Sequence, residues 1–217
     1  MVILLSKFEN NSDPAFMNFI FSEFKKEAMK TRNPRCVMIG TTSVGKTTLV
    51  HYAVHGTKTD STRPTTAALF SHFETREFPI RQMDIWDTAG MEQYQSLNAE
   101  YFKGANGAIL VFDITNFQSF EKLEPLYKEL LSFARSVPII AVAANKCDRR
   151  SEAEEVTQEE IESWCKSHGC QFFYTSAITG ENVMELFDHM ARLLPEEVET
   201  VSQVTLEENA EVIRHCC

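Results

Sequence analysis

The sequence predicts an α/β fold, in which a six-stranded and mostly parallel sheet has one antiparallel edge strand and helices on both faces. Two observations support this prediction. Short runs of nearly continuous apolar residues, typical of parallel strands covered on both faces, alternate with segments whose apolar residues recur at helical spacing. One stretch instead has two strand-like runs in succession. Strand–helix alternation of this kind indicates a parallel sheet packed between helices.

The parallel strands are predicted from four apolar runs: Cys36–Ile39, Ala108–Phe112, Ile139–Ala143 and Phe172–Tyr174. The antiparallel edge is predicted from the runs Leu69–Phe78 and Arg81–Trp86, because the short link around Pro79 suits a hairpin.

Three helices follow from the apolar spacing. One covers Ser119–Ala134, and another covers Asn182–Leu194. A third opens at Thr157, since Glu160 three residues later completes a capping box.

The bulk composition limits the class of protein. A chain of 217 residues suits one domain with modest extensions. The net charge of −10 argues against a nucleic-acid partner and against adhesion to anionic lipid through charge alone. The six cysteines include no Cys-x-x-Cys pair, and no apolar run reaches the roughly 20 residues of a membrane span.

The chain is expected to divide into three parts. Residues 1–33 form an N-terminal extension with a Phe-rich stretch, 34–194 a nucleotide-binding domain, and 195–217 a flexible acidic tail. The Phe-rich stretch could be a membrane-surface helix, a helix packed on the domain, or a segment that is not translated.

A phosphate-binding loop is predicted at Gly40–Thr47, which matches G-x-x-x-x-G-K-[ST] between a strand and a helix. Backbone N–H groups of such a loop surround phosphates, and the following helix directs its positive end at them. Lys46 is expected to reach the β- and γ-phosphates, and the Thr47 hydroxyl to bind Mg²⁺. The predicted contacts from this loop are Thr42, Ser43, Val44, Gly45, Lys46, Thr47 and Thr48.

The loop alone does not select the nucleotide, because ATPases and small-molecule kinases use it too. Selection is predicted at Asn145, Lys146 and Asp148, which follow the next-to-last strand. The Asp148 carboxylate can accept hydrogen bonds from guanine N1–H and the 2-amino group, and adenine offers neither. Lys146 can lie along the base, and Asn145 can tie this loop to the phosphate loop. After the last strand, a backbone N–H of Ser176–Ala177 can meet the guanine 6-oxygen.

With these motifs, the chain resembles the Ras superfamily of small GTPases over residues 34–194, and within it the Rab family. The Rab-like segments are Ile85–Gly90, Tyr101–Ala105 and Phe112–Phe120. The resemblance implies the P-loop small GTPase fold, GTP and GDP as ligands, Mg²⁺ as cofactor, and a monomer that works with effectors, an exchange factor and a GTPase activator.

The resemblance also implies two switch segments. Thr65 would bind Mg²⁺ and the γ-phosphate in the GTP state, Asp87 would hold a Mg²⁺-bound water, and the Gly90 N–H would contact the γ-phosphate. Thr47, Thr65 and Asp87 are therefore the expected metal residues, and Lys46, Thr65 and Gly90 the expected catalytic ones.

Three departures from the family pattern bear on turnover. Met91 stands where the family has a glutamine that orients the attacking water, which predicts slow intrinsic hydrolysis. Thr42 and Ser43 are bulkier than usual and could hinder an arginine finger. Lys58 stands where relatives have an aromatic ring on the guanine, and losing a stack worth about 1–3 kcal/mol would speed nucleotide release.

The terminal pair Cys216 and Cys217 resembles the double geranylgeranyl acceptor of many Rabs. Two lipid chains would attach the protein stably to the cytoplasmic face of an intracellular membrane, between periods in the cytosol. The leading hypothesis is thus a Rab-like switch in vesicle trafficking. The alternatives are a GTP-loaded scaffold with negligible turnover, favoured by Met91, and an ATP-using P-loop enzyme, disfavoured by Asp148.

Overall fold

The computed structural model describes residues 31–58, 69–87, 102–136, 138–195 and 197–198. One compact unit spans Asn33–Pro195. In the other unit, strand β1 (Thr31–Arg32) pairs antiparallel with β8 (Glu197–Val198), with Thr31 opposite Val198. The expected division of the chain at residues 33 and 195 stays a prediction.

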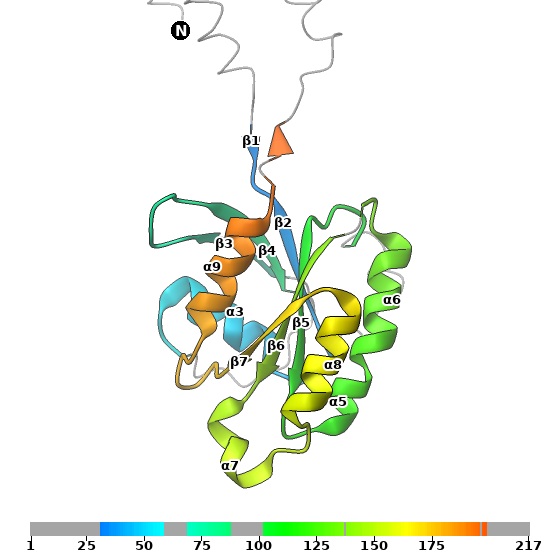
Figure 1. Ribbon diagram of the computed structural model, residues 1–217. Coiled ribbons are helices and arrows are strands. Elements are labelled where there is room, and N and C mark those ends of the chain that lie inside the picture. Colours follow the sequence, from blue (N-terminus) through cyan, green and yellow to red (C-terminus); the bar gives the residue numbers. More distant parts are fainter. Residues whose placement is uncertain (1–30, 59–68, 88–101, 137, 196, 199–217) are drawn as a thin grey trace, which may run out of the picture. The chain divides into compact units, whose positions relative to one another are not determined.

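The larger unit is built on a six-stranded sheet in the order β3-β4-β2-β5-β6-β7 (Figure 1). Strands β2, β4, β5, β6 and β7 are parallel, and β3 pairs antiparallel with β4 at one edge. This confirms the predicted sheet. The strand bounds are β2 Arg35–Ile39, β3 Leu69–Glu74, β4 Gln82–Asp87, β5 Gly107–Asp113, β6 Ile139–Asn145 and β7 Gln171–Thr175.

Helices cover both faces of the sheet (Figure 1). One face carries α3 (Lys46–His55) and α9 (Val183–Leu193). The other carries α5 (Phe117–Glu121), α6 (Leu123–Phe133) and α8 (Gln158–His168). After β6, the chain makes a short 3₁₀ turn, η2 (Cys147–Arg149), and the single turn α7 (Arg150–Ala153).

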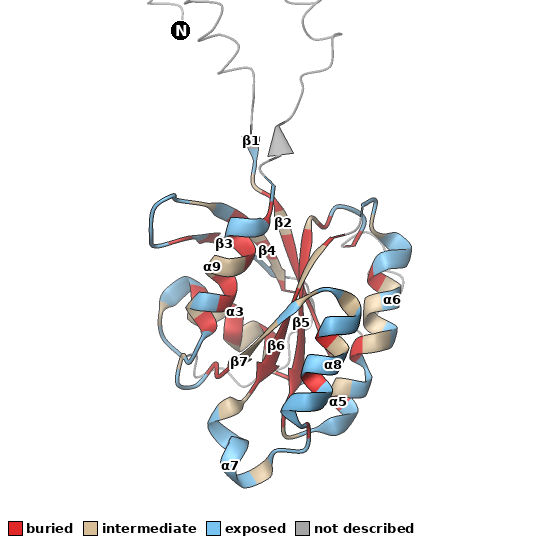
Figure 2. Ribbon diagram, viewed as in Figure 1, coloured by how far each residue is buried: buried red, intermediate tan, exposed pale blue. Residues whose placement is uncertain are grey.

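Among the described residues, the core consists of two apolar clusters, one on each face of the sheet. Alternate residues of β5 separate them: Ile109 and Val111 belong to the cluster under α3 and α9, and Leu110 and Phe112 to the cluster under α6 and α8. All of β5 is buried, as its continuous apolar run predicts. Figure 2 shows buried residues concentrated in the central strands.

The predicted strand Leu69–Phe78 is too long, because β3 ends at Glu74. Its neighbour Thr75 closes a turn instead: its N–H donates to the Arg81 carbonyl at 2.9 Å, and its hydroxyl accepts from the Arg81 N–H at 2.9 Å. Phe78, 92% exposed, lies in this link.

The predicted helix Ser119–Ala134 is two helices, α5 and α6, separated at Lys122. Pro125 has no N–H to donate to the carbonyl four residues before it, so the helical bond to Glu121 cannot form. The capping box of α8 is confirmed, since Thr157 and Glu160 each bond to the other's backbone N–H. The predicted C-terminal helix is confirmed as α9. Within the described ranges, none of the helices combines the length and apolar character that a membrane span requires.

Candidate nucleotide-binding site

The candidate site lies at the carboxyl ends of the parallel strands, where three loops follow β2, β6 and β7. Because parallel strands all end at the same edge of a sheet, loops far apart in the sequence meet there. The first is the Gly-rich loop before α3, the second contains Lys146–Asp148, and the third contains Ser176–Ala177.

The Gly-rich loop needs its two motif glycines. A Cβ at Gly40 would collide with the Val111 carbonyl oxygen on β5. Gly45 caps α3 with φ 102°, a left-handed conformation, and a Cβ there would collide with the Asn145 amide. The loop is therefore pressed against the next strand and against the second loop, and only glycine permits that approach.

Lys46 opens α3 and is 5% exposed. Its ammonium donates to the carbonyl oxygens of Gly40 at 2.7 Å and of Thr41 at 2.8 Å, across the loop. The charge is thus held at the start of the helix, whose N-terminal N–H groups favour anions. In the same loop Val44 is buried, Thr42 and Ser43 are exposed, and Thr47 and Thr48 are half-buried.

Asn145 joins the three loops. Its side-chain amide donates to the Val44 carbonyl at 2.7 Å, and its side-chain oxygen accepts from the Thr175 hydroxyl at 3.3 Å. Its own carbonyl accepts from the Ile114 N–H at 3.1 Å. Asn145 is 1% exposed, so these bonds form away from water. The bond from Asn145 to Val44 is the predicted link between the phosphate loop and the loop that carries Asp148.

Lys146 follows in a left-handed conformation, with φ 66°. Its ammonium lies 2.6 Å from the Asp113 carboxylate at the end of β5. Burial acts to raise the pKa of Asp113, but Lys146 and the two hydrogen bonds from Thr115 outweigh it, so the pKa lies below its ordinary value. An ionised Asp113 therefore fixes the end of the Lys146 side chain, and this orients its stem.

Asp148 is exposed, and its carboxylate accepts a hydrogen bond from the Ser176 hydroxyl at 2.6 Å. The Ser176 N–H is already bonded to the Glu181 carbonyl at 3.1 Å. Two backbone N–H groups, those of Ser176 and Ala177, were predicted as donors to the guanine 6-oxygen. Only the Ala177 N–H has no hydrogen-bond acceptor among the described residues, so it is the better candidate.

Asp87, at the end of β4, is 1% exposed, and neither of its oxygens has a well-formed hydrogen bond within the described part of the chain. Burial raises the pKa of Asp87, and the nearby Thr47 hydroxyl and Lys46 ammonium only partly offset this. A buried, unpaired carboxylate beside a threonine hydroxyl fits a hard divalent cation such as Mg²⁺, which proteins bind through one or two carboxylates plus phosphate oxygens.

Several predicted residues lie outside the described residues: Thr65, Gly90 and Met91 of the switch segments, and Cys216 and Cys217. Lys58 is exposed at the end of the described segment after α3. One residue of the site was missed by the sequence analysis, namely Asp113. Its signal is a charged residue that ends a fully apolar strand at the site's edge of the sheet.

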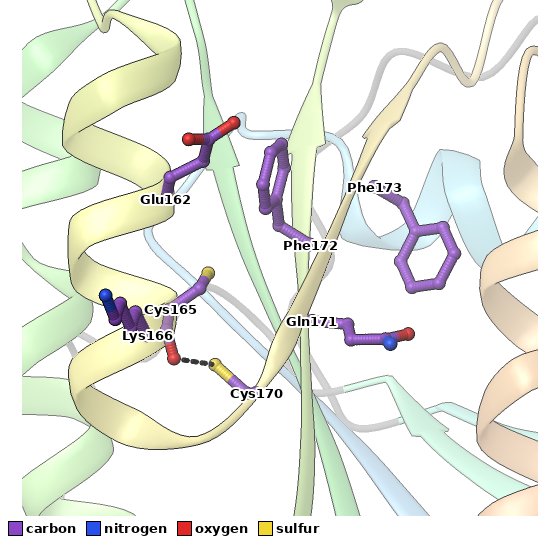
Figure 3. A pocket seen from close by; sticks show the side chains of 7 residues that line it. All are labelled: Glu162, Cys165, Lys166, Cys170, Gln171, Phe172 and Phe173. Carbon is purple, nitrogen blue, oxygen red and sulfur yellow. Dashed lines mark hydrogen bonds between the residues drawn. The ribbon is translucent and has the colours of Figure 1, made fainter.

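A groove of about 400 Å³ lies elsewhere, between α8 and β7 (Figure 3). It contains none of the residues predicted to bind nucleotide. Cys170 donates from its thiol to the Cys165 carbonyl at 3.8 Å, and hydrogen bonding to Cys170 together with burial raises the pKa of the Cys165 thiol. The four cysteines in the described ranges are free thiols.

Fold and site together define a P-loop protein of the α/β class. The sequence profile of the Ras family matches residues 35–196. The chain is 40% identical over 170 residues to GTP-binding protein ypt5 of Schizosaccharomyces pombe, covering 76% of this chain and 79% of ypt5. It is 37% identical to Ras-related protein RABF2b of Arabidopsis thaliana (76% and 83% covered) and 34% identical to Ras-related protein Rab-7b of Bos taurus (72% and 80% covered). The chain therefore belongs to the Ras family and is a Rab-like small GTPase.

Proposed function

We propose that this protein is a guanine-nucleotide-dependent switch of the Rab type that recruits effector proteins in vesicle trafficking. The observation that supports this most directly is the convergence on Asn145, which holds the phosphate loop against the loop that carries Asp148. The name of the relative ypt5 describes a GTP-binding protein, which agrees with the chemistry proposed for Asp148.

The base is bound by three groups in this proposal. The Asp148 carboxylate accepts from guanine N1–H and the 2-amino group, the Lys146 stem covers one face of the ring, and the Ala177 N–H donates to the 6-oxygen. The Ser176 hydroxyl orients Asp148, and the Asp113 carboxylate orients Lys146. A bound adenine would cover the Asp148 carboxylate without donating a hydrogen bond to it, and burying a charged acceptor without that donor costs about 1–3 kcal/mol or more.

The phosphates are bound by the N–H groups of the loop from Thr42 to Thr48 and by the Lys46 ammonium. Mg²⁺, when bound, supplies charge that neutralises the β- and γ-phosphate oxygens. Thr47 and Asp87 would hold it, together with Thr65 from the first switch segment. Lys46 stabilises negative charge that develops on the transferred phosphoryl group, and the Gly90 N–H contacts the γ-phosphate.

Hydrolysis is proposed to be slow without a partner, because the Met91 thioether neither donates a hydrogen bond nor accepts one strongly. Lys58 in place of an aromatic ring would weaken binding and speed release. A protein that exchanges quickly and hydrolyses slowly would be GTP-loaded by default. A constitutively GTP-bound scaffold with negligible GTPase activity is the second candidate, and Met91 is the residue that favours it.

The tail would carry geranylgeranyl groups on Cys216 and Cys217. Since the stretch from Glu196 to Glu211 holds six Glu, the lipids rather than charge would anchor the protein to the cytoplasmic face of an intracellular membrane. The protein would act there as a monomer and cycle with the cytosol. Its partners would be effectors, an exchange factor and a GTPase activator, with no nucleic acid.

The test is the nucleotide content of the protein purified without added nucleotide. We expect guanine nucleotide at close to one molecule per chain, with GTP in excess of GDP if loading is the default. Denaturing the protein releases the nucleotide, and chromatography then separates GDP, GTP, ADP and ATP. Adenine nucleotide, or none that survives purification and none that binds on addition of GDP with Mg²⁺, would contradict the proposal.

A further inference from the structure

Tyr52 makes a contact between α3, the helix that follows the phosphate loop, and the turn after β7 that contains Ser176. It lies on α3, which begins at Lys46, and its ring is half-buried against the core cluster on that face. The phenol end of the ring lies against Gly180: a Cβ built on Gly180 would collide with the hydroxyl oxygen and Cζ of Tyr52. Gly180 also has φ 84°, in the left-handed region.

Gly180 is part of a turn whose geometry sets the position of Ser176. The Gly180 N–H donates to the Ser176 carbonyl at 2.8 Å, and the Ser176 N–H donates to the Glu181 carbonyl at 3.1 Å. Inside the turn, the Ser176 hydroxyl accepts from the N–H groups of Ile178 at 3.2 Å and Thr179 at 3.1 Å. These bonds direct its one hydroxyl proton outward, to the Asp148 carboxylate.

We propose that Tyr52 is a positioning residue for base recognition. Its ring contacts the Ser176–Glu181 turn at Gly180, and the turn, through the Ser176 hydroxyl, holds the Asp148 carboxylate in place. This inference rests on the proposed function, in which Asp148 recognises guanine. One helix then supports both halves of the site, with Lys46 at its first residue and Tyr52 nearer its end.

A purely structural role for Tyr52 makes a different prediction. If the ring only fills space in the core, its loss lowers the stability of the whole domain and affects all bound nucleotides alike. If the ring positions Asp148, its loss should weaken binding most for the nucleotide that makes the most hydrogen bonds to Asp148. Inosine diphosphate provides the comparison, because its base lacks the 2-amino group, one of the two donors proposed for Asp148.

The experiment measures dissociation rates of GDP and of inosine diphosphate, with Mg²⁺, from the full chain and its variants. We expect Tyr52→Ala to release GDP about 10–100 times faster, the scale of a misplacement of about 1 Å in a binding group. The ratio of the two dissociation rates should move toward one. Tyr52→Phe keeps the ring, and Val54→Ala changes an exposed residue of the same helix, so both should stay within about twofold of the original protein.

A double-mutant cycle tests the contact itself. Gly180→Ala should speed GDP release in the original protein, because the new methyl meets the Tyr52 ring. In a Tyr52→Ala background the methyl has room, so its effect should be smaller there. The backbone strain at φ 84° is present in both backgrounds and cancels in the cycle, which leaves the pairwise term.

Thermal unfolding identifies variants that fail to fold. If Tyr52→Ala fails to fold, Tyr52→Leu is used instead, because leucine keeps more of the apolar volume. A lowered unfolding temperature with an unchanged GDP-to-inosine-diphosphate ratio, or an additive cycle, would overturn the inference while leaving the proposed function intact. If the original protein binds no GDP, the proposed function fails first, and the role of Tyr52 fails with it.

Discussion

At the scale of single residues, the loop proposed to bind the base depends on side chains that are themselves held by others. Asp148 is the only acceptor proposed for the edge of the base, and Ser176 orients it at 2.6 Å. Lys146 is held in the same way by Asp113. Such arrangements fix a charged group before the ligand arrives, so less side-chain entropy is lost on binding.

Asp148→Asn should change the preferred base. An amide can donate where the carboxylate only accepts, and xanthine has a carbonyl in place of the guanine 2-amino group. We expect GDP affinity to fall about 100-fold or more and xanthosine diphosphate to bind better than GDP, since unpaired buried donors cost about 1–3 kcal/mol each. Competition with a fluorescent nucleotide measures both.

The control for that prediction is Glu152→Gln, which removes an exposed carboxylate from α7, close by in the sequence. It should leave both affinities unchanged. Loss of GDP binding without any gain for xanthosine diphosphate would mean that Asp148 supports the loop rather than the base.

Asp87 is expected to oppose folding when the metal is absent. Its pKa is raised above the unfolded value of about 3.9, so the charged form destabilises the fold at neutral pH, and this penalty disappears as the pH falls to about 4. Asp87→Asn should therefore stabilise the metal- and nucleotide-free protein at pH 7, by about 1–3 kcal/mol, and the difference should narrow at lower pH.

Urea unfolding in chelator measures this difference in the free energy of unfolding. A second series with GDP, in chelator and in Mg²⁺, measures how much the metal stabilises each protein. At the same GDP concentration, replacing chelator by Mg²⁺ should stabilise the original protein, whereas it should stabilise the Asn variant little. A variant that is less stable than the original in chelator at pH 7 would show that the Asp87 carboxylate is stabilised within the protein itself.

At the scale of elements, local sequence accounts for where most helices and strands lie. The continuous apolar run of β5 and the capping box of α8 are both properties of neighbouring residues, and both were predicted. The division of α5 from α6 was also visible locally, in Pro125, but the apolar spacing on either side concealed it. The pairing of Lys146 with Asp113 was not predictable in this way, because it depends on strands β5 and β6 lying side by side.

The capping box of α8 should account for a measurable part of the stability of that helix. The Thr157 hydroxyl accepts from the Glu160 N–H at 3.3 Å, and the Glu160 carboxylate accepts from the Thr157 N–H at 2.8 Å. Thr157→Ala removes the first bond and should cost about 1 kcal/mol in urea unfolding. Ser163→Ala, an exposed site in the middle of the same helix, should cost much less, and equal effects would contradict the assignment.

At the scale of the whole molecule, the site combines parts that the structure describes with parts beyond the described ranges. The Asn145 amide bonds to Val44, a residue 101 positions earlier, so this link between the two loops forms only once strands β2, β5 and β6 lie side by side. The motifs predicted which loops would contribute to the site, because each follows a recognisable strand, and the bond from Asn145 to Val44 joins two of these loops. The motifs did not reveal the side chains that hold the predicted site residues, since those contacts are made between distant parts of the chain.

Met91→Gln should increase the rate of GTP hydrolysis. A glutamine side chain can both donate to and accept from the attacking water, so single-turnover GTP hydrolysis should rise by at least about tenfold, a modest share of the 10²–10⁴ that positioned proton-transfer groups contribute. Met91→Leu serves as the control, as it keeps an apolar side chain and should hydrolyse GTP as slowly as the original. Equal rates in all three proteins would mean that Met91 does not limit hydrolysis.

The amide of Asn145 also has a consequence for how the two halves of a nucleotide cooperate. Because that amide joins the two loops, a molecule containing both base and diphosphate would meet both proposed subsites at once, and its second contact would be intramolecular. Guanosine and pyrophosphate supplied as separate molecules each bear the full entropic cost of association. A mixture of the two should therefore displace GDP far less effectively than their covalent combination does.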